Sequence, residues 1–216
     1  MKKLLLLLIF IPFTFFGQEL PEQYWQKGNL HTHSFWSDGD DFPEMIIQWY
    51  KDNNYQFIAL SDHNTIASSR DYWYKLKTLD EQNKTLEKYQ KSFGDWVETK
   101  IDSSGTYVRL KTFEEYKSKL EHPKSFLIIR SEEVTSSFEN KPVHINVTNI
   151  KEKIEPFKGN SVYEVMQQTL DAVHAQRKKF NIPMFAHINH PNFGYGINTE
   201  DLKKLNGERF FELYNG

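Results

Sequence analysis

Apolar runs of strand length alternate with stretches of helical spacing along most of the chain. The runs that read as strands are 27–33, 55–61, 126–130, 143–150, 183–187 and 209–214. The stretches that read as helices are 40–53, 66–79, 81–93, 112–122, 161–180 and a short segment from 199. This order predicts an α/β fold with a mostly parallel sheet. The run Phe57–Leu60 is apolar at every position, which is typical of a strand buried on both faces.

Local signals predict the start of one helix and the inner faces of two. Asp40 and Asp41 precede Pro43 and Glu44, so we expect an aspartate cap with proline in the first turn. Helical spacing puts these side chains on its inner face: Met45, Ile46, Trp49 and Tyr50. The inner face of 161–180 is expected to hold Val162, Val165, Met166, Thr169, Leu170 and Val173.

Residues 66–125 form a long excursion between the second and third predicted strands. Segments 96–101 and 107–110 flank a polar turn at 102–106 and predict a β-hairpin. Thr112 and Glu115 form a capping box that opens the next helix. An excursion of this length suits an inserted lid or a wall that selects the substrate.

The third and fourth predicted strands have a short connection. Only eight residues separate Val134 from Val143, whereas a parallel crossover needs about a dozen or more. We therefore expect these two strands to be antiparallel neighbours. That pairing would bring His144 back beside Glu133.

Side chains that bind metals follow several of the strands. His31 and His33 are two residues apart, so on a strand they project to the same side, and Asp38 lies on the loop beyond. Taken alone, such a pair also fits two surface histidines near a turn. Later strand ends carry further candidates: Asp62, His63, Glu132, Glu133, His187 and His190. Because α/β barrels collect catalytic groups at the carboxyl ends of their strands, we expect a shared site for Zn, Mn or Fe.

Composition narrows the chemistry. The 216 residues are enough for one domain with a substantial core. The 27 basic and 29 acidic residues nearly balance and form no basic block, so no nucleic-acid partner is indicated. The chain has no cysteine, which excludes disulfides, thiolate metal sites and a cysteine nucleophile.

The first 17 residues read as a secretory signal peptide. Lys2 and Lys3 precede an apolar run at 4–16, and Gly17–Gln18 is a plausible cleavage point. The run is short for a membrane span, although an uncleaved anchor is the alternative. We expect the remaining domain, 18–216, to be exported to the periplasm or secreted, without membrane association after cleavage.

Five motifs in order resemble the PHP superfamily, named for its polymerase and histidinol phosphatase domains. They are His31-Thr32-His33, Ser37-Asp38-Gly39, Ser61-Asp62-His63-Asn64-Thr65, Glu133-Val134-Thr135 followed by His144, and His190-Pro191-Asn192. The resemblance implies a distorted β/α barrel of seven strands, of which about six are present here. It also implies a cluster of two or three divalent metal ions, with phosphoester hydrolysis as the commonest activity.

The resemblance assigns metal ligands position by position. His31, His33 and Glu133 would bind the first ion, Glu133 would bridge to a second with His144 and His190, and Asp38 and His63 would bind a third. Glu133 is preferred to its neighbour Glu132 because the family's glutamate precedes an apolar residue and then Ser or Thr. His190 is preferred to His187 because the family's histidine precedes proline.

One family motif has no counterpart in the chain. The Asp-x-His of the seventh strand, which supplies ligands to the first and third ions, is absent, and with it the last βα unit. A fragment of a longer protein and a degenerate site both fit this difference. We expect the 216-residue chain to bind metal poorly and to leave a sheet edge open.

These features favour an exported metal-dependent hydrolase, a phosphatase or phosphodiesterase acting on a small phosphorylated molecule. Asp62 and Glu212 are the predicted catalytic residues, Asp62 by orienting a ligand imidazole. Asn64 and Asn192 are candidate pocket groups, whereas Arg70 and Arg130 fit surface roles better than phosphate binding. Two alternatives stay open: a secreted ligand-binding protein without catalysis, and a metallohydrolase of amide or carbamate bonds. The oligomeric state is left open.

Overall fold

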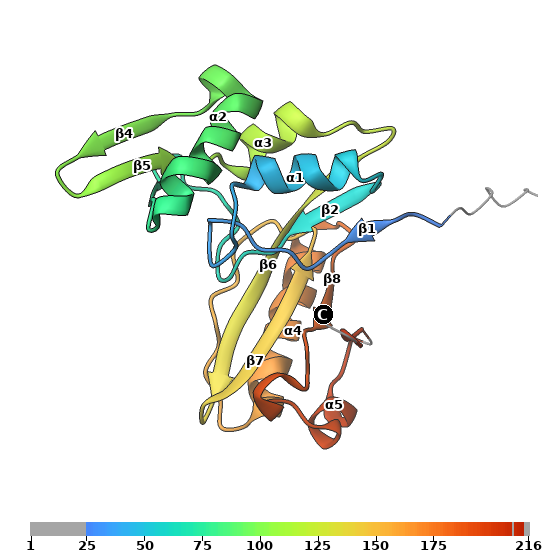
Figure 1. The fold of residues 1–216 in the computed structure, drawn as a ribbon. Helices are drawn as coiled ribbons and strands as arrows, with labels where there is room; N and C mark the ends of the chain where they lie inside the picture. Colours follow the sequence, from blue (N-terminus) through green and yellow to red (C-terminus); the bar gives the residue numbers. More distant parts are fainter. Residues whose placement is uncertain (1–24, 209, 214–216) are drawn as a thin grey trace, which may run out of the picture.

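The computed structural model describes residues 25–208 and 210–213, which form two sheets flanked by helices (Figure 1). The expected signal peptide lies outside these residues, as do Arg209 and Tyr214 at the ends of the last expected strand. No helix within the described part of the chain is both long and apolar enough to cross a membrane.

The main sheet is mixed rather than mostly parallel. Its five strands, in spatial order, are β1 (Gly28–Asn29), β2 (Phe57–Leu60), β6 (Leu127–Phe138), β7 (Lys141–Thr148) and β8 (Phe185–Ile188). The first three are parallel to one another, but β6, β7 and β8 pair antiparallel. The expectation of antiparallel third and fourth strands is therefore confirmed, and that of a mostly parallel sheet is wrong.

A tight turn causes the change of direction. Phe138 pairs with Lys141, and the two residues between them, Glu139 and Asn140, have φ angles of 47° and 64°. Positive φ at both central residues is the requirement of the two-residue turn that matches the twist of a hairpin. The chain therefore folds straight back, and β6 and β7 become the longest pair in the sheet.

The described strands form an open, curled sheet like half of a barrel, so a closed barrel of the expected type is not seen among them. Within its described residues, 210–213, the sixth expected strand shows one parallel bridge, between Ile188 and Phe211. Ile188 N–H donates to Phe210 O (3.0 Å), and Glu212 N–H donates to Ile188 O (2.8 Å). These two bonds place Glu212 beside the end of β8.

The excursion builds the second sheet, which projects from the body of the molecule (Figure 1). Its order is β3 (Trp73–Lys75), β5 (Gly105–Arg109) and β4 (Thr99–Asp102), and β4 with β5 is the expected hairpin. The expected helix at 66–79 is wrong. Tyr74 is buried between the less buried Trp73 and Lys75 and stacks on Phe35, so the side chains alternate with the period of a strand.

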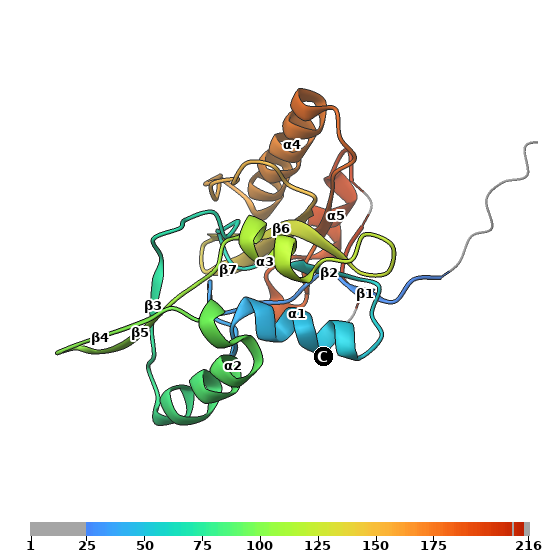
Figure 2. The same cartoon turned by 90° about the horizontal axis from the view of Figure 1, so that it is seen from above.

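The helices cover both faces of the main sheet. α1 (Pro43–Asp52) and α4 (Val162–Phe180) lie on opposite sides of it in Figure 2. The remaining helical elements are the π-helical turn Glu81–Thr85, α2 (Leu86–Phe93), the 3-10 turns Gly94–Trp96 and Phe193–Tyr195, α3 (Phe113–Leu120) and α5 (Thr199–Lys204). The predicted capping box of α3 is present, and all six side chains expected on the inner face of α4 are buried.

The prediction for α1 was only partly correct. Its N-cap is Phe42 without a side-chain bond, because Asp41 accepts a hydrogen bond from Phe42 N–H instead of from the helix. Glu44 and Ile47 are fully buried, whereas Trp49, expected inside, is 55% exposed. Tyr50 turns toward β1, where its hydroxyl lies 2.5 Å from Asn29 Nδ2.

Two apolar clusters divide the interior. The first joins α1, β2, α2, α3 and the second sheet around residues such as Phe42, Ile58 and Val108. The second joins β7, β8 and α4 around Val147, Met166 and Ala186. β6 contributes to both, through Ile128 and Val134, so the middle of this strand is held from two sides.

Candidate metal centre

The loop after β1 carries three of the predicted ligands. His31, His33 and Asp38 follow β1, and the loop closes through a hydrogen bond from Gly39 N–H to Ser34 O (3.0 Å). A Cβ atom on Gly39 would lie 2.4 Å from the backbone of His33, so only glycine allows so tight a return.

Asp62 holds this loop in place through hydrogen bonds. It is 3% exposed and accepts hydrogen bonds from Ser34 N–H (2.7 Å), Ser34 Oγ (2.8 Å) and Ser37 Oγ (2.7 Å). Burial raises the pKa of Asp62 despite these bonds. Asp62, predicted to orient a ligand imidazole, therefore binds the loop that carries His33 and Asp38, and its part in orienting a ligand stays a prediction.

The register of β6 with β7 selects which acid faces the site. Glu133 pairs with Asn146, and Thr135 pairs with His144. Side chains of directly opposite residues share one face of a sheet, so all four point the same way. Glu132 points to the other face, where its Oε2 accepts a hydrogen bond from Ile154 N–H (2.9 Å). The alternate ligand Glu132 is therefore outside the cluster.

Glu133 is the centre of the arrangement, and its side chain has no exposed surface. Its Oε2 lies 3.1 Å from His33 Nε2, 2.9 Å from His63 Nδ1 and 3.6 Å from His31 Nε2. Its Oε1 lies 3.2 Å from His144 Nδ1 and 3.4 Å from His190 Nε2. One buried carboxylate thus separates two groups of imidazoles.

Asp38 and His63 lie at the outer side of the cluster. Asp38 Oδ1 is 2.8 Å from His33 Nδ1, and Asp38 Oδ2 is 3.4 Å from His63 Nε2. His63 also contacts the Thr135 hydroxyl. Attraction to His63 and His33 lowers the pKa of Asp38 against the opposing effect of burial, so this carboxylate is ionised at neutral pH.

Glu212 supports two of the histidines. Its Oε1 is 3.1 Å from His31 Nδ1, and its Oε2 accepts a hydrogen bond from His190 N–H (2.9 Å). A carboxylate at Nδ1 favours the tautomer that carries the proton there, which leaves the Nε2 lone pair of His31 pointing toward Glu133. The predicted residue Glu212 therefore lies where it can position a ligand.

His187, the alternate to His190, lies beside the cluster. It sits opposite Asn146 in the sheet and is 9% exposed. Burial, with a smaller effect from His31, lowers its pKa to about 4. His187 is consequently neutral at pH 7, and the ion pairs with Glu133 come from the other five histidines of this region.

Sequence reasoning missed several residues around the site. Asn189 donates from Nδ2 to Glu133 Oε1 (2.6 Å) and to Asn146 Oδ1 (3.0 Å). Thr135 lies two residues after Glu133, and that spacing on a strand could have identified it.

Asn64, a predicted pocket group, instead exchanges hydrogen bonds with the Thr135 backbone. Asn192 does line the pocket.

The donor set fits divalent cations. His31 Nε2 and His33 Nε2 are 3.1 Å apart, and two nitrogens on one tetrahedral zinc ion, with bonds of about 2.0–2.1 Å, lie about 3.3 Å apart. Glu133 Oε2 and His144 Nδ1 are buried without a hydrogen-bond partner among the described residues. Three overlapping groups could each hold an ion: His31, His33 and Glu133; His33, Asp38 and His63; His63, Glu133 and His144.

Electrostatics agree with a site that exchanges protons for cations. Burial opposes ionisation of Glu133, but the surrounding imidazoles outweigh it and hold its pKa well below the usual range. In turn, the pKa values of His31 and His33 are raised, because Glu133 outweighs the effect of their burial. A metal ion and protons would therefore compete for the same nitrogen atoms.

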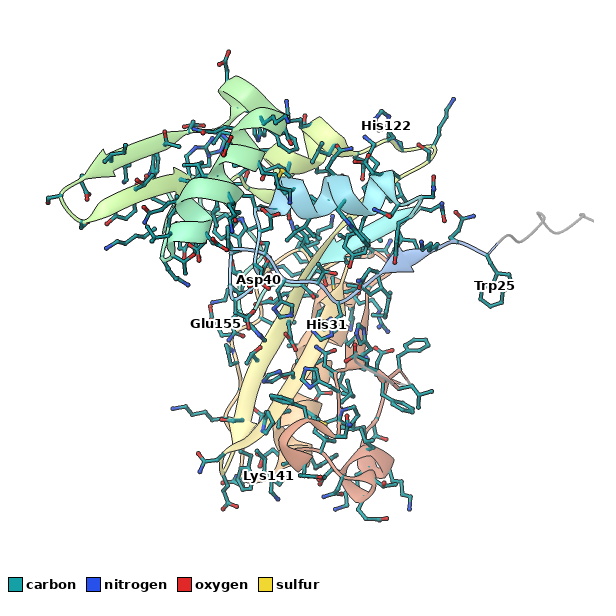
Figure 3. The ribbon with its side chains drawn as sticks, in the orientation of Figure 1. Trp25, His31, Asp40, His122, Lys141 and Glu155 are labelled. Carbon is teal, nitrogen blue, oxygen red and sulfur yellow. The ribbon has the colours of Figure 1, made fainter. Side chains whose placement is uncertain are left out.

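The cluster opens into a cavity of about 860 Å³. In Figure 3 His31 lies in the middle of the molecule, in front of the long strands β6 and β7. Besides the cluster and Glu212, the cavity is lined by Thr32, Asp40, Tyr50, Asn192 and Phe193. Its size suits a small-molecule ligand.

Comparisons with known proteins give a limited likeness. No protein-family model and no curated protein matches the chain. A solved two-domain protein from Bacteroides vulgatus, named as containing a predicted PHP-like metal-dependent phosphoesterase, aligns with a TM-score of 0.38 and 16% identity. The alignment covers 79% of this chain and 36% of that one, so the chain spans about a third of its length.

A second solved structure, named as a candidate metal-dependent phosphoesterase from Bifidobacterium adolescentis, aligns with a TM-score of 0.42 and 10% identity. It covers 87% of this chain and 77% of the other. Because both TM-scores lie below 0.5, the function proposed next rests on the residues of this chain.

Proposed function

We propose that this protein is a metal-dependent hydrolase of phosphoesters, a phosphatase or phosphodiesterase of small molecules. The observation that carries the proposal is the buried Glu133 carboxylate, with imidazole nitrogens within 3.6 Å of both of its oxygens. A buried acid without a lysine or arginine partner is costly unless cations compensate it. Bound metal ions would provide that compensation.

The proposed ligand sets are those that the PHP resemblance implies, and their side chains lie within the cluster around Glu133. His31, His33 and Glu133 would hold one ion, Glu133 with His144 and His190 a second, and Asp38 with His63 a third. The ions, of Zn, Mn or Fe, would supply Lewis-acid charge for the phosphoryl oxygens and lower the pKa of a water molecule to about 7. Such chemistry requires no serine or cysteine nucleophile.

The chain's own residues prepare the site for this role. Glu212 fixes the orientation of His31, and Asp62 fixes the loop that carries His33. Asn189 donates to the Glu133 oxygen that faces His144. These three polar side chains hold the ligands in place before any ion binds, which is the role of outer-shell partners in metal sites.

Metal content and turnover of the full chain test the proposal. Protein purified with Mn or Zn is analysed for bound metal and assayed on an aryl phosphate, beside the variants His31→Ala and His122→Ala. With Mn or Zn supplied in excess, which offsets the weak binding expected without the Asp-x-His motif, we expect bound metal and turnover in the wild type. His122→Ala should match the wild type, because His122 is exposed and far from His31 in Figure 3. His31→Ala should lose turnover by about 100-fold or more.

Three results would contradict the proposal in different ways. Protein that binds neither Mn nor Zn would contradict the proposed metal site. Turnover that survives His31→Ala would place catalysis elsewhere. Bound metal without turnover of any phosphoester would favour a binding protein, or a hydrolase of amide or carbamate bonds. Export through residues 1–17 stays a prediction, which N-terminal sequencing of the mature protein tests.

A further inference from the structure

The wall of the cavity beside His190 is a fixed aromatic surface. Phe193 is 59% exposed, and its ring lies 5.2 Å from that of His190 and 6.3 Å from that of His144. It lines the cavity directly. An exposed phenylalanine ring next to a polar cluster offers an apolar face on which part of a ligand can pack.

The loop that carries Phe193 is held against β7. Phe193 N–H donates to His190 O (2.8 Å), and Ile197 N–H donates to Pro191 O (3.2 Å). A Cβ atom on Gly196 would lie 2.3 Å from Pro142 O, so the loop packs closely on the start of β7. The ring of Phe193 is therefore presented from a constrained backbone, which lowers the entropic cost of stacking on a ligand.

Apart from the histidines, the charged residues that are described in the cavity lining are all acidic. Among the described residues that line it, Asp38, Asp40, Glu133 and Glu212 are acidic, and none is lysine or arginine. Arg130, once considered for phosphate, pairs with Glu114 and lies outside the cavity. Among the described lining residues, the groups that could neutralise a phosphoryl group are the histidines, in their protonated form or through bound metal ions, and a second anion on the ligand would enter a cavity also lined by the exposed Asp40.

We propose that the site selects phosphoesters with a single anionic group whose other part is a flat, uncharged ring stacked on Phe193. This inference rests on the proposed function and names its substrate class. Phe193 supplies the preference for the ring. Asp40 supplies the rejection of a second negative charge.

Phosphonates test the inference without the confounding effect of leaving-group reactivity, since their carbon–phosphorus bond is not hydrolysed. The full chain saturated with Mn is titrated calorimetrically with methylphosphonate, phenylphosphonate and 4-carboxyphenylphosphonate. We expect phenylphosphonate to bind about three- to tenfold more tightly than methylphosphonate, the range of an aromatic pair. The added carboxylate should weaken binding about fivefold, as one screened charge pair does.

Variants assign these preferences to residues. Phe193→Ala should remove the advantage of phenylphosphonate and leave methylphosphonate unchanged. Tyr195→Ala is the matched control, because Tyr195 belongs to the same loop, is 91% exposed and does not line the cavity. Asp40→Asn should reduce the penalty of the carboxylate.

The outcomes separate the inference from the proposed function. If no phosphonate binds the Mn-loaded protein, the proposed function fails and the inference fails with it. If methylphosphonate and phenylphosphonate bind equally, or Phe193→Ala weakens both alike, only the aromatic preference is overturned. If the carboxylate carries no penalty, or Asp40→Asn leaves the penalty unchanged, the charge selection is overturned.

Discussion

Two clusters of charged residues in this molecule are centred on glutamates, and the basic residues that pair with these glutamates differ between the clusters. In the excursion, Glu98 and Glu115 flank Arg109, whose Nη2 lies 2.5 Å from Glu98 Oε1 and 2.9 Å from Glu115 Oε1. Lys111 adds a second cation 2.5 Å from Glu98. In the main sheet, the ion-pair partners of Glu133 within the described part of the chain are all imidazoles.

The difference lies in which charges are permanent. Hydrogen bonds from Arg109 hold the pKa values of Glu98 and Glu115 at about 2, and arginine cannot release its proton at any ordinary pH. That cluster is complete and needs no other ion. Histidine can be charged or neutral near pH 7, so the Glu133 cluster can give up protons and accept metal cations instead.

A structural ion pair and an ion site therefore differ in the residues that surround the acid. An acidic side chain paired with arginine or lysine stabilises the local fold. An acidic side chain surrounded by several histidines leaves nitrogen lone pairs that can bind an exchangeable metal ion.

Glu133→Gln should strongly weaken binding at the metal centre. The substitution keeps the size of the side chain but removes the charge and one good ligand oxygen between the two groups of histidines. We expect Mn affinity to fall by about 100-fold or more, beyond the loss of roughly 10- to 100-fold that removal of an outer-shell partner causes. Isothermal titration of the full chain with Mn, up to millimolar concentrations, measures the change.

The neighbouring residue provides the control. Glu132→Gln alters the same strand by the same chemical change, but Glu132 points away from the site to Ile154. Its Mn affinity should stay within about twofold of the wild type, as expected for a residue outside the ligand shell. Equal losses in both variants would mean that disruption of β6, rather than loss of a ligand, explains the result.

Glu132→Gln should also change how stability depends on pH. Burial raises the pKa of Glu132 to about 7 from its usual 4.5. A carboxyl group with a raised pKa contributes stability below pH 4.5 and loses that contribution as pH rises through about 7. Between pH 4.5 and 8, the free energy of unfolding of the wild type should therefore decrease by about 1–3 kcal/mol relative to that of the variant.

Urea unfolding of the chelated protein at several pH values measures this effect. The chelator removes the contribution of bound metal, so the comparison reports on Glu132 alone. A stability difference that is constant from pH 4.5 to pH 8 would contradict the raised pKa.

Much of the fold could be predicted from local signals. The apolar run of β2, the capping box of α3 and the inner face of α4 each follow from a few adjacent residues, and all were found. The short connection between β6 and β7 predicted their antiparallel pairing. Where chain length or spacing alone decides the geometry, sequence is sufficient.

The failures involve contacts between distant segments. The segment 66–79, expected to be a helix, instead contains the short strand Trp73–Lys75, because these residues pair with β5, over thirty residues further along the chain. Trp49 is exposed because α1 turns Ile47 and Glu44 inward, where Glu44 accepts a hydrogen bond from Trp96 (3.0 Å). Helical spacing predicts which residues share a face, but the partner decides which face is buried.

The candidate site was easier to predict than its surroundings. The structure brings His31, His33, Asp38, His63, Glu133, His144 and His190 together, since each follows or lies on a strand of the same sheet. The roles of Asp62 and Asn64 could not be inferred, because their hydrogen bonds go to the backbone and hydroxyl groups of other segments. Which atoms meet across loops is set by tertiary packing.

The smallest predicted effect concerns the cluster that is already complete. Arg109→Met keeps most of the side chain's apolar stem but leaves Glu98 and Glu115 without their shared cation. We expect a loss of about 1–2 kcal/mol at pH 7, less than for a fully buried pair, because Glu98 is half-exposed and can return to water. Bound Mn per chain should not change, since Arg109 lies outside the metal centre.

The pH dependence of this loss distinguishes the two kinds of cluster. Carboxyl groups with lowered pKa values contribute stability above their usual 4.5 and lose it as pH falls through about 2. Urea unfolding should therefore show the wild type and Arg109→Met converging as pH falls from 6 toward 3. If the gap persists at low pH, Arg109 stabilises the hairpin by packing rather than by charge; if Mn binding falls with it, the two clusters are not independent.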